Sequence, residues 1–416
     1  MKKKILFILI FAIVKVEAQT STFSVADSLF AKGRYKLALK ELDTKEASFL
    51  SNYKKAVIYE SIDNYKKAAY FLEKAITFKD DEKAKLKLAK IYRASKLSKK
   101  AIPIYEEILA IDSLNLVLKY QLGKLYIINK KPKKAIETFT YLIKNDTENP
   151  NYSYHLGLSY ALNGQRDPMI NSFIDTYQKD STHIRAISRL AKSFLKLKDL
   201  DSTQLFVNKG LAISPNDLDL NKIKINQFFR DKKYKESIPY LLNIDSLYKK
   251  ETYSTSLLGK AYYNIDSLEK AKKYFTKLKF KDRANFKAHT YLGHIDFKQE
   301  KYNSARMNYM MATFIGKESR DEEYYGMARV FYEFKKPKQA INAYQNAFEE
   351  NHRNYRALYQ LAKLSDDYYK DKKIAYKHYI KYIETFYEID EGMSAFVRNR
   401  IKEIKKEYFL RGETLK

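Results

Sequence analysis

The sequence lacks cysteine and tryptophan and is poor in glycine and proline. Its 416 residues include only 11 glycines and 7 prolines, too few to form the turns of a large β-rich protein. Without cysteine the chain cannot form a disulfide framework, a thiolate metal site, a cysteine nucleophile or an acylated cysteine anchor. The absence of tryptophan removes a common platform for stacking sugars. These absences leave a mainly helical protein as the natural expectation.

Motifs for catalysis and metal binding are also missing. The sequence contains no glycine-rich phosphate loop and no serine nucleophile elbow. Its six histidines are scattered, and none forms a metal-protease pair at four-residue spacing. The adjacent pair Asp366 and Asp367 is expected to lie in a solvated turn at a helix end. We therefore predict a protein that is not an enzyme and needs no cofactor or metal.

The first eighteen residues are typical of a secretory signal peptide. Lys2, Lys3 and Lys4 form a basic start, an apolar run covers residues 5–14, and a small residue, Ala18, stands where a signal peptidase would cut. The alternative, an uncleaved membrane helix, needs about 20 apolar residues. No later segment is apolar enough to span a bilayer. We expect an exported bacterial protein, periplasmic or secreted after cleavage.

An internal period of about 34 residues runs along the rest of the chain. Small residues recur at intervals of 30 to 35 residues, most of them 34. An aromatic residue usually follows three positions later, alanine twelve positions later, and a large apolar residue sixteen positions later. The recurring anchor positions are Ala26, Ala56, Ala89, Gly123, Gly157, Ala191, Ile225, Gly259, Gly293, Ala328 and Ala362.

This pattern predicts a repeated pair of antiparallel helices, with a crossing at the small residues. Gly259 costs roughly 1 kcal/mol of helix propensity relative to alanine. We expect this cost to be offset by close packing against the second helix, where Ala271 faces the crossing. Gly33 and Gly164 are expected in the turns between the two helices. Pro132, Pro168 and Pro337 are expected at the start of second helices, where a missing N–H is tolerated.

The period and the order of residue types resemble the tetratricopeptide repeat (TPR). The resemblance implies an all-α fold, a right-handed α-solenoid of about eleven helix-turn-helix units, in which each unit contacts only its neighbours. Departures from the pattern put local geometry in doubt but not the architecture. They are Ile225 for the small residue, Asp296 and Ser365 for the aromatic, Met169, Thr203 and Ser237 for the alanine, and one extra residue before Ala375.

We predict three segments: a signal peptide (1–18), one continuous solenoid without separate domains (19–386), and a C-terminal capping helix with a tail (387–416). A terminal helix must cover the last repeat. Residues 391–409 fit this role because apolar residues form one stripe. A membrane-surface helix is the alternative for that segment. The stripe consists of Met393, Phe396, Val397, Ile401, Ile404 and Tyr408, and Arg398, Arg400, Lys402, Lys405 and Lys406 lie largely outside it.

The resemblance implies that the first helices of the repeats line a concave groove. The positions assigned to that groove are rich in cations and aromatic residues, which would attract an acidic, extended protein partner. The predicted groove residues are Lys90, Arg93, Lys124, Tyr154, Arg185, Lys192, Lys196, Lys222, Asn226, Phe229, Arg230, Tyr253, Lys260, Tyr263, Lys287, Phe297, Tyr325, Arg329 and Tyr359.

Three of these residues match part of a pattern that some family members use for a peptide carboxylate. Lys222 and Asn226 are one helical turn apart and Lys287 follows, but Leu257 and Tyr291 stand where the pattern needs an asparagine and a basic residue. Because lysine is abundant in this chain, a chance match is the preferred interpretation.

The net charge leaves two classes of function open. Removal of residues 1–18, with four lysines and one glutamate, changes the formal charge from +29 to +26. Export argues against nucleic acid as the partner. The first hypothesis is a scaffold that organises an envelope complex by binding a protein, and the second is a module for cell-wall polymer or anionic lipid. A compositional bias toward lysine and tyrosine is a third explanation for the basic groove. The oligomeric state stays open.

Overall fold

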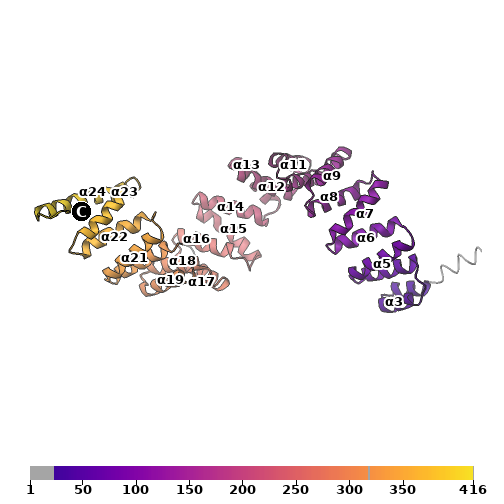
Figure 1. The fold of residues 1–416 in the computed structure, drawn as a ribbon, viewed down its shortest axis with the longest axis horizontal. Helices are drawn as coiled ribbons and strands as arrows, with labels where there is room; N and C mark the ends of the chain where they lie inside the picture. Colours follow the sequence, from indigo (N-terminus) through magenta and orange to yellow (C-terminus); the bar gives the residue numbers. More distant parts are fainter. Residues whose placement is uncertain (1–22, 317–318, 416) are drawn as a thin grey trace, which may run out of the picture. The chain divides into compact units, whose positions relative to one another are not determined.

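The computed structural model describes residues 23–316 and 319–415, and these contain 23 α-helices and no strand (Figure 1). The expected signal peptide, residues 1–18, lies outside the described residues. None of the described helices is both long and apolar enough to cross a membrane. The prediction of an all-α chain of consecutive helical hairpins is confirmed.

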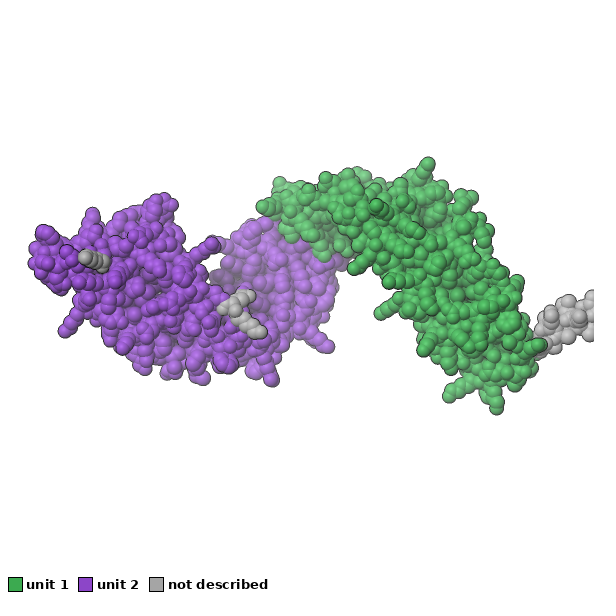
Figure 2. All heavy atoms as spheres, in the orientation of Figure 1, with its two compact units in different colours: residues 1–213 green, residues 214–416 purple. Residues whose placement is uncertain are grey.

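The chain divides into two compact units between Ile213 and Ser214 (Figure 2). The first unit holds six hairpins, and each helix packs against the next one along the chain. These helices are α2 (Ser24–Ala31), α3 (Tyr35–Asp43), α4 (Phe49–Ser61), α5 (Tyr65–Phe78), α6 (Glu82–Ala94), α7 (Ser98–Ile111), α8 (Leu116–Ile128), α9 (Pro132–Asn145), α10 (Pro150–Leu162), α11 (Arg166–Lys179), α12 (Ile184–Leu197) and α13 (Leu200–Ile213).

The second unit holds five hairpins and a longer terminal helix, again with each helix packed against the next. The prediction of one continuous array without separate domains stays a prediction. The helices are α14 (Leu218–Arg230), α15 (Tyr234–Leu247), α16 (Tyr253–Asn264), α17 (Leu268–Lys281), α18 (Phe286–Lys298), α19 (Tyr302–Ile315), α20 (Asp321–Glu333), α21 (Pro337–Glu350), α22 (Tyr355–Tyr368), α23 (Lys373–Phe386) and α24 (Glu391–Leu410).

Local signals in the sequence set the helix ends. Many first helices begin at a capping side chain; Asn115, for example, accepts a hydrogen bond from the backbone N–H of Leu118 at 3.0 Å. The tight turns inside the hairpins use a left-handed backbone, which suits Gly33 and Gly164. Elsewhere a residue with a side chain takes this conformation: Asp63, Lys96, Lys130, Lys198, Lys232, Asp266, Glu300 and Lys335.

An aromatic ring covers each anchor glycine. A Cβ atom added to Gly259 would lie 2.8 Å from the nearest atom of the Phe275 ring. The expected partner was an alanine of the facing helix, so this part of the prediction is wrong: the large apolar residue itself occupies the space. Tyr309 does so twice, because its ring lies against both Gly293 and Gly326. Gly259 is therefore kept because a ring needs the room of its missing side chain.

The hydrophobic core is a series of clusters along each unit. One cluster in the first unit extends from Ala56 to Tyr152, and one in the second extends from Ile225 to Ile295. Each cluster is built from residues of neighbouring hairpins, as expected for a stack of repeats.

The terminal helix α24 buries Val397, Ile401, Ile404 and Tyr408 in the last cluster of the second unit. Its contacts overturn the expectation of a solvated Asp366. The carboxylate of Asp366 is buried, and it accepts hydrogen bonds from Arg400 Nε at 2.6 Å and Arg400 Nη2 at 3.1 Å. The sequence could not show this pair because its partners are 34 residues apart.

Candidate partner-binding surface

All the predicted groove residues lie on even-numbered helices, the first helices of the hairpins. Those of the first unit lie on α6, α8, α10 and α12, and those of the second on α14, α16, α18, α20 and α22. Most are exposed or half-buried. Tyr154 differs, because its side chain is 6% exposed and packs against the rings of Phe173 and His183. It therefore supports the hairpin and offers little surface to a partner.

In the first unit, cations from three helices act on one another. Burial lowers the pKa of Lys124, and the positive charges of Arg93 and Arg185 lower it further. Burial also lowers the pKa of His155, to about 4, and nearby Lys124 and Arg185 contribute to that shift. The charges that perturb these groups are all positive. We call Arg93, Lys124 and Arg185 the basic cluster; an anion placed among them would relieve their mutual repulsion.

Aromatic residues flank the basic cluster. The Lys124 ammonium lies 5.1 Å from the ring centroid of Tyr120, and that ring meets His155 edge-on at 5.2 Å. Arg93 donates a hydrogen bond to Gln121 Oε1 at 2.6 Å. These contacts hold the cations in place, which lowers the entropy that a bound partner would cost.

The second unit carries a carboxylate of its own among its cations. Burial lowers the pKa of Lys260, Lys287 lowers it further, and Glu322 acts in the opposite direction. Glu322 Oε1 lies 2.8 Å from Nε2 of His294, and the Tyr309 hydroxyl lies 2.7 Å from Nδ1 of that histidine. The hydrogen bond from His294 is the main reason why the pKa of Glu322 is lowered. Glu322 thus partly neutralises the positive charges of Lys260 and Lys287.

Two residues of the partial carboxylate-binding pattern, Lys222 and Asn226, already interact with other side chains of the protein. Lys222 Nζ lies 3.3 Å from Glu251 Oε2, and Asn226 Oδ1 accepts a hydrogen bond from the Tyr253 hydroxyl at 3.0 Å. Burial raises the pKa of Tyr253 to about 12, with a smaller effect from Glu251. A peptide carboxylate would have to displace Glu251, which supports the interpretation of a chance match.

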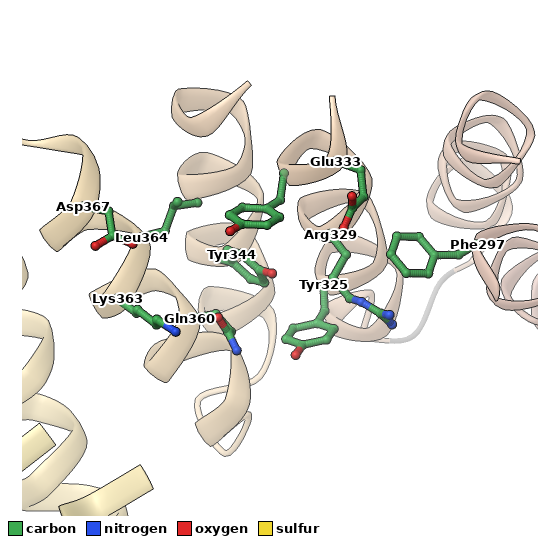
Figure 3. Close-up of a pocket in the computed structure, with 10 residues that line it drawn as sticks. Phe297, Tyr325, Arg329, Glu333, Tyr344, Gln360, Lys363, Leu364 and Asp367 are labelled. Carbon is green, nitrogen blue, oxygen red and sulfur yellow. The ribbon is translucent and has the colours of Figure 1, made fainter. Parts of the chain in front are cut away.

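A cavity of about 240 Å³ lies farther along the second unit (Figure 3). It brings together the predicted residues Phe297, Tyr325 and Arg329. The guanidinium of Arg329 lies 3.9 Å from the ring centroid of Phe297, a cation–π contact that leaves its donors available. Figure 3 shows the nitrogen ends of Arg329, Gln360 and Lys363 along one side and the carboxylates of Glu333 and Asp367 along the other.

The cations of this cavity are not paired with acids of the described chain. Neither Arg329 nor Lys363 has a carboxylate oxygen within 4.0 Å among residues 23–316 and 319–415. Tyr325 meets the buried ring of Tyr344 edge-on at 5.4 Å, so its ring is fixed. The cavity therefore offers two cations without ion pairs in the described chain beside rigid aromatic surface. The carboxylates of Glu333 and Asp367 line its other side, so an acidic group would fit only on the side of the cations.

Solved structures resemble this chain in fold. The structure of yeast Tom70 is 13% identical, covers 95% of this chain and 97% of its own, and has a TM-score of 0.41. PilF from Pseudomonas aeruginosa is 18% identical with a TM-score of 0.42, covering 51% of this chain and 97% of its own. YrrB, a TPR protein with an unusual peptide-binding site, is 18% identical with a TM-score of 0.37, covering 46% and 97%. No family model matches the sequence, and no curated protein matches it.

The decisive observation is the chain's own geometry, eleven described hairpins whose anchors recur at about 34 residues. The chain has the TPR fold. These three solved structures are at most 18% identical with TM-scores of at most 0.42, so the assignment of the fold rests on the chain's own hairpins. What each neighbour binds therefore does not transfer to this protein.

The sequence pattern did not identify some residues that line the candidate binding surface. His294 was placed among the scattered histidines, although it links Tyr309 and Glu322. Gln360 and Tyr344 line the cavity from positions outside the groove pattern. A signal existed for Tyr344, which stands at the repeated large apolar position. In the described ranges, no group of three or more His, Cys, Asp or Glu side chains is arranged to hold a metal ion.

Proposed function

We propose that this protein is a non-enzymatic interaction scaffold that binds an acidic, extended protein segment along its even-numbered helices. The observation that carries the proposal is the basic cluster, in which Lys124 lies 5.1 Å from the ring centroid of Tyr120, and burial and the charges of Arg93 and Arg185 lower its pKa. A folded protein gains nothing from such repulsion, whereas an acidic partner would relieve it. The cavity around Arg329 would supply a second contact, with aromatic surface that adds to affinity.

The test is binding of a fluorescent peptide rich in glutamate and tyrosine, followed by anisotropy. The double variant Lys124→Glu/Arg185→Glu should weaken binding at least tenfold, because it replaces attraction by repulsion at two positions of the basic cluster. A tenfold loss corresponds to about 1.4 kcal/mol of binding free energy. Lys99→Glu/Lys133→Glu is the matched control with the same change in net charge; these exposed lysines lie on the odd-numbered helices α7 and α9. Binding by the Lys124→Glu/Arg185→Glu variant that is as strong as that of the control would refute the proposal.

We also propose that the protein is exported and acts in the bacterial envelope. The basis is the pattern of residues 1–18, with a basic start, an apolar run and a small residue at its end. Expression of the full sequence in a bacterium should give an extracytoplasmic protein whose first residue is Gln19. A cytoplasmic product that still carries Met1 would contradict export.

The alternative function is a module for cell-wall polymer or anionic lipid, which the formal charge of +29 favours. This alternative predicts binding to purified polymer or to anionic vesicles that falls steeply as salt rises, because exposed charges are screened. The scaffold predicts a preference for the glutamate–tyrosine peptide over a peptide of glutamate alone. Equal binding of the two peptides would favour the polyanion module.

A further inference from the structure

A second cavity, of about 450 Å³, lies in the first unit between the start of α11 and the end of α12. The end of α10 and the following turn close it on one side. Its volume falls in the range of roughly 300–1,000 Å³ that is usual for small-molecule sites. It is lined by Ala161, Gly164, Gln165, Arg166, Met169, Phe173, Arg189, Lys192, Ser193, Leu195 and Lys196.

The charged residues that line this cavity all have one sign. Four cations line it, and none of the described lining residues is acidic. Arg166 has a weak ion pair with the exposed Asp167, with Nε and Oδ1 3.5 Å apart. Arg189 and Lys196 are exposed, and neither has an ion pair within the described chain. An anion at the mouth of the cavity would therefore have at least two available partners.

The interior of the cavity is apolar. Met169, Phe173 and Leu195 form its apolar wall, and Ala161 and Gly164 leave space beside them. Met169 stands at the position where most repeats have alanine. A methionine side chain is flexible and fills irregular space, so it adapts to an aliphatic chain. The side chain of Leu195 is 38% exposed, so apolar surface also reaches the mouth.

The lining chemistry favours an amphiphile over a peptide. Each residue of a bound peptide brings an N–H and a C=O that need hydrogen-bond partners. The only lining residues with neutral polar side chains are Gln165 and Ser193. Cations at the mouth and an apolar interior instead match a molecule with one negative headgroup and one aliphatic tail.

We propose that this cavity binds a long-chain carboxylate, with the headgroup at Arg189 and Lys196 and the tail against Met169 and Leu195. This inference does not rest on the proposed partner binding, although Lys196 also belongs to the predicted groove. It predicts that neither half of the ligand suffices alone, because an inorganic anion lacks the apolar contact and a neutral alcohol lacks the charge.

The experiment is titration calorimetry of the full chain with dodecanoate below its micellar concentration, beside dodecanol and inorganic phosphate. Dodecanoate should bind at one site per chain, at least tenfold more tightly than either comparison molecule. The double variant Arg189→Ala/Lys196→Ala should lose at least tenfold in affinity, and Met169→Gln should weaken binding severalfold. Lys133→Ala, on α9, should bind like the unaltered protein.

Three outcomes would contradict carboxylate binding in this cavity. Dodecanoate binding within twofold of normal in the double variant would overturn the proposal, as would phosphate or dodecanol binding as tightly as dodecanoate. Capture of an acidic peptide by these residues without dodecanoate binding would also overturn it. The comparison of the three ligands needs no variant, so it decides the matter even where a substitution disturbs folding. Binding of anionic vesicles that is lost in the double variant would assign the same chemistry to a lipid acyl chain.

Discussion

At the scale of single residues, the helical hairpins depend on aromatic rings that fill the space left by the missing side chains of glycines. Gly123, Gly157, Gly259 and Gly293 each face an aromatic ring of the second helix, and an added Cβ would lie 2.6 to 2.8 Å from it. Where the facing residue is Leu72 or Val207, the anchor is alanine, Ala56 or Ala191. Each anchor glycine therefore lies opposite a ring, although Ala89 and Ala328 show that an alanine anchor can also face an aromatic residue.

Gly259→Ala should destabilise the second unit by up to about 2 kcal/mol. Overpacking costs about 1–3 kcal/mol, and the gain in helix propensity offsets roughly 1 kcal/mol. The cost stays moderate because Ala89 and Ala328 face Tyr105 and Tyr344 in other repeats. The measurement is the free energy of unfolding in urea.

The control for this prediction is a double-mutant cycle. Phe275→Leu makes room at the crossing, so the double variant Gly259→Ala/Phe275→Leu should lose less stability than the sum of the two single variants. Additive effects would show that the ring does not limit the residue at position 259.

At the scale of elements, most hairpin turns contain a residue whose left-handed backbone conformation lowers stability, and a glycine there would remove this cost. Eight residues with side chains occupy left-handed positions, among them Lys130 with φ of 54°. Such a conformation costs roughly 1–2 kcal/mol for a residue with a Cβ. Gly33 and Gly164 avoid that cost at the equivalent position in their own hairpins.

Lys130→Gly should stabilise the α8–α9 hairpin by about 0.5 kcal/mol, because relief of the left-handed backbone outweighs the greater freedom of glycine when unfolded. Hydrogen exchange of the α8 and α9 backbone amides measures the stability of this hairpin. Lys131→Gly is the neighbouring control. Since Lys131 has φ of −107°, glycine there should destabilise, and stabilisation by both variants would contradict this account.

The attachment of α24 should depend on pH through Asp366. Burial raises the pKa of Asp366, but Arg400 and Lys372 together lower it by more through hydrogen bonds and charge, so the net shift is downward. A carboxyl group with a lowered folded pKa adds stability above its unfolded value of about 4, and this stability is lost as the pH falls through the folded pKa. Protection of residues 391–410 against proteolysis should therefore decrease in acid.

Asp366→Asn should destabilise α24 by about 1–3 kcal/mol at pH 7, because it removes the buried carboxylate that accepts two hydrogen bonds from Arg400. Among the described residues, Arg400 then keeps only Glu403 and Glu407, on its own helix, as ion-pair partners. The variant should also lose most of the acid dependence. Asp367→Asn is the matched control, since Asp367 is exposed and should change stability by less than about 0.5 kcal/mol. Equal effects of the two variants would refute a specific role for the buried carboxylate.

The sequence predicted the elements well and their side-chain partners poorly. A 34-residue period specifies hairpins because packing repeats with it, and Asn115 and Pro132 mark helix starts by local chemistry alone. The pairing of Asp366 with Arg400 depends on contacts between helices distant in sequence. The same reason explains why Tyr154 was predicted on the surface, and why the cavities were not predicted at all.

At the scale of the whole molecule, the two units present their cations differently. In the basic cluster of the first unit, burial and the charges of Arg93 and Arg185 all lower the pKa of Lys124, whereas in the second unit Glu322 opposes the lowering of the pKa of Lys260 by burial and Lys287. Salt should therefore weaken binding of an acidic peptide. At 0.1 M salt the screening length is about 10 Å, and at 1 M it is about 3 Å. We expect at least a tenfold loss of affinity over this range by fluorescence anisotropy, and no loss would contradict an electrostatic mode.

The most direct measurement of the central claim is photo-crosslinking of the glutamate–tyrosine peptide to the full chain, mapped by mass spectrometry. The proposed function predicts cross-links on even-numbered helices, concentrated on α6, α8 and α12 and around Arg329. It also predicts that Lys124→Glu/Arg185→Glu removes those of the first unit. Cross-links spread equally over odd- and even-numbered helices, or unchanged in the variant, would contradict the claim that these helices bind the partner.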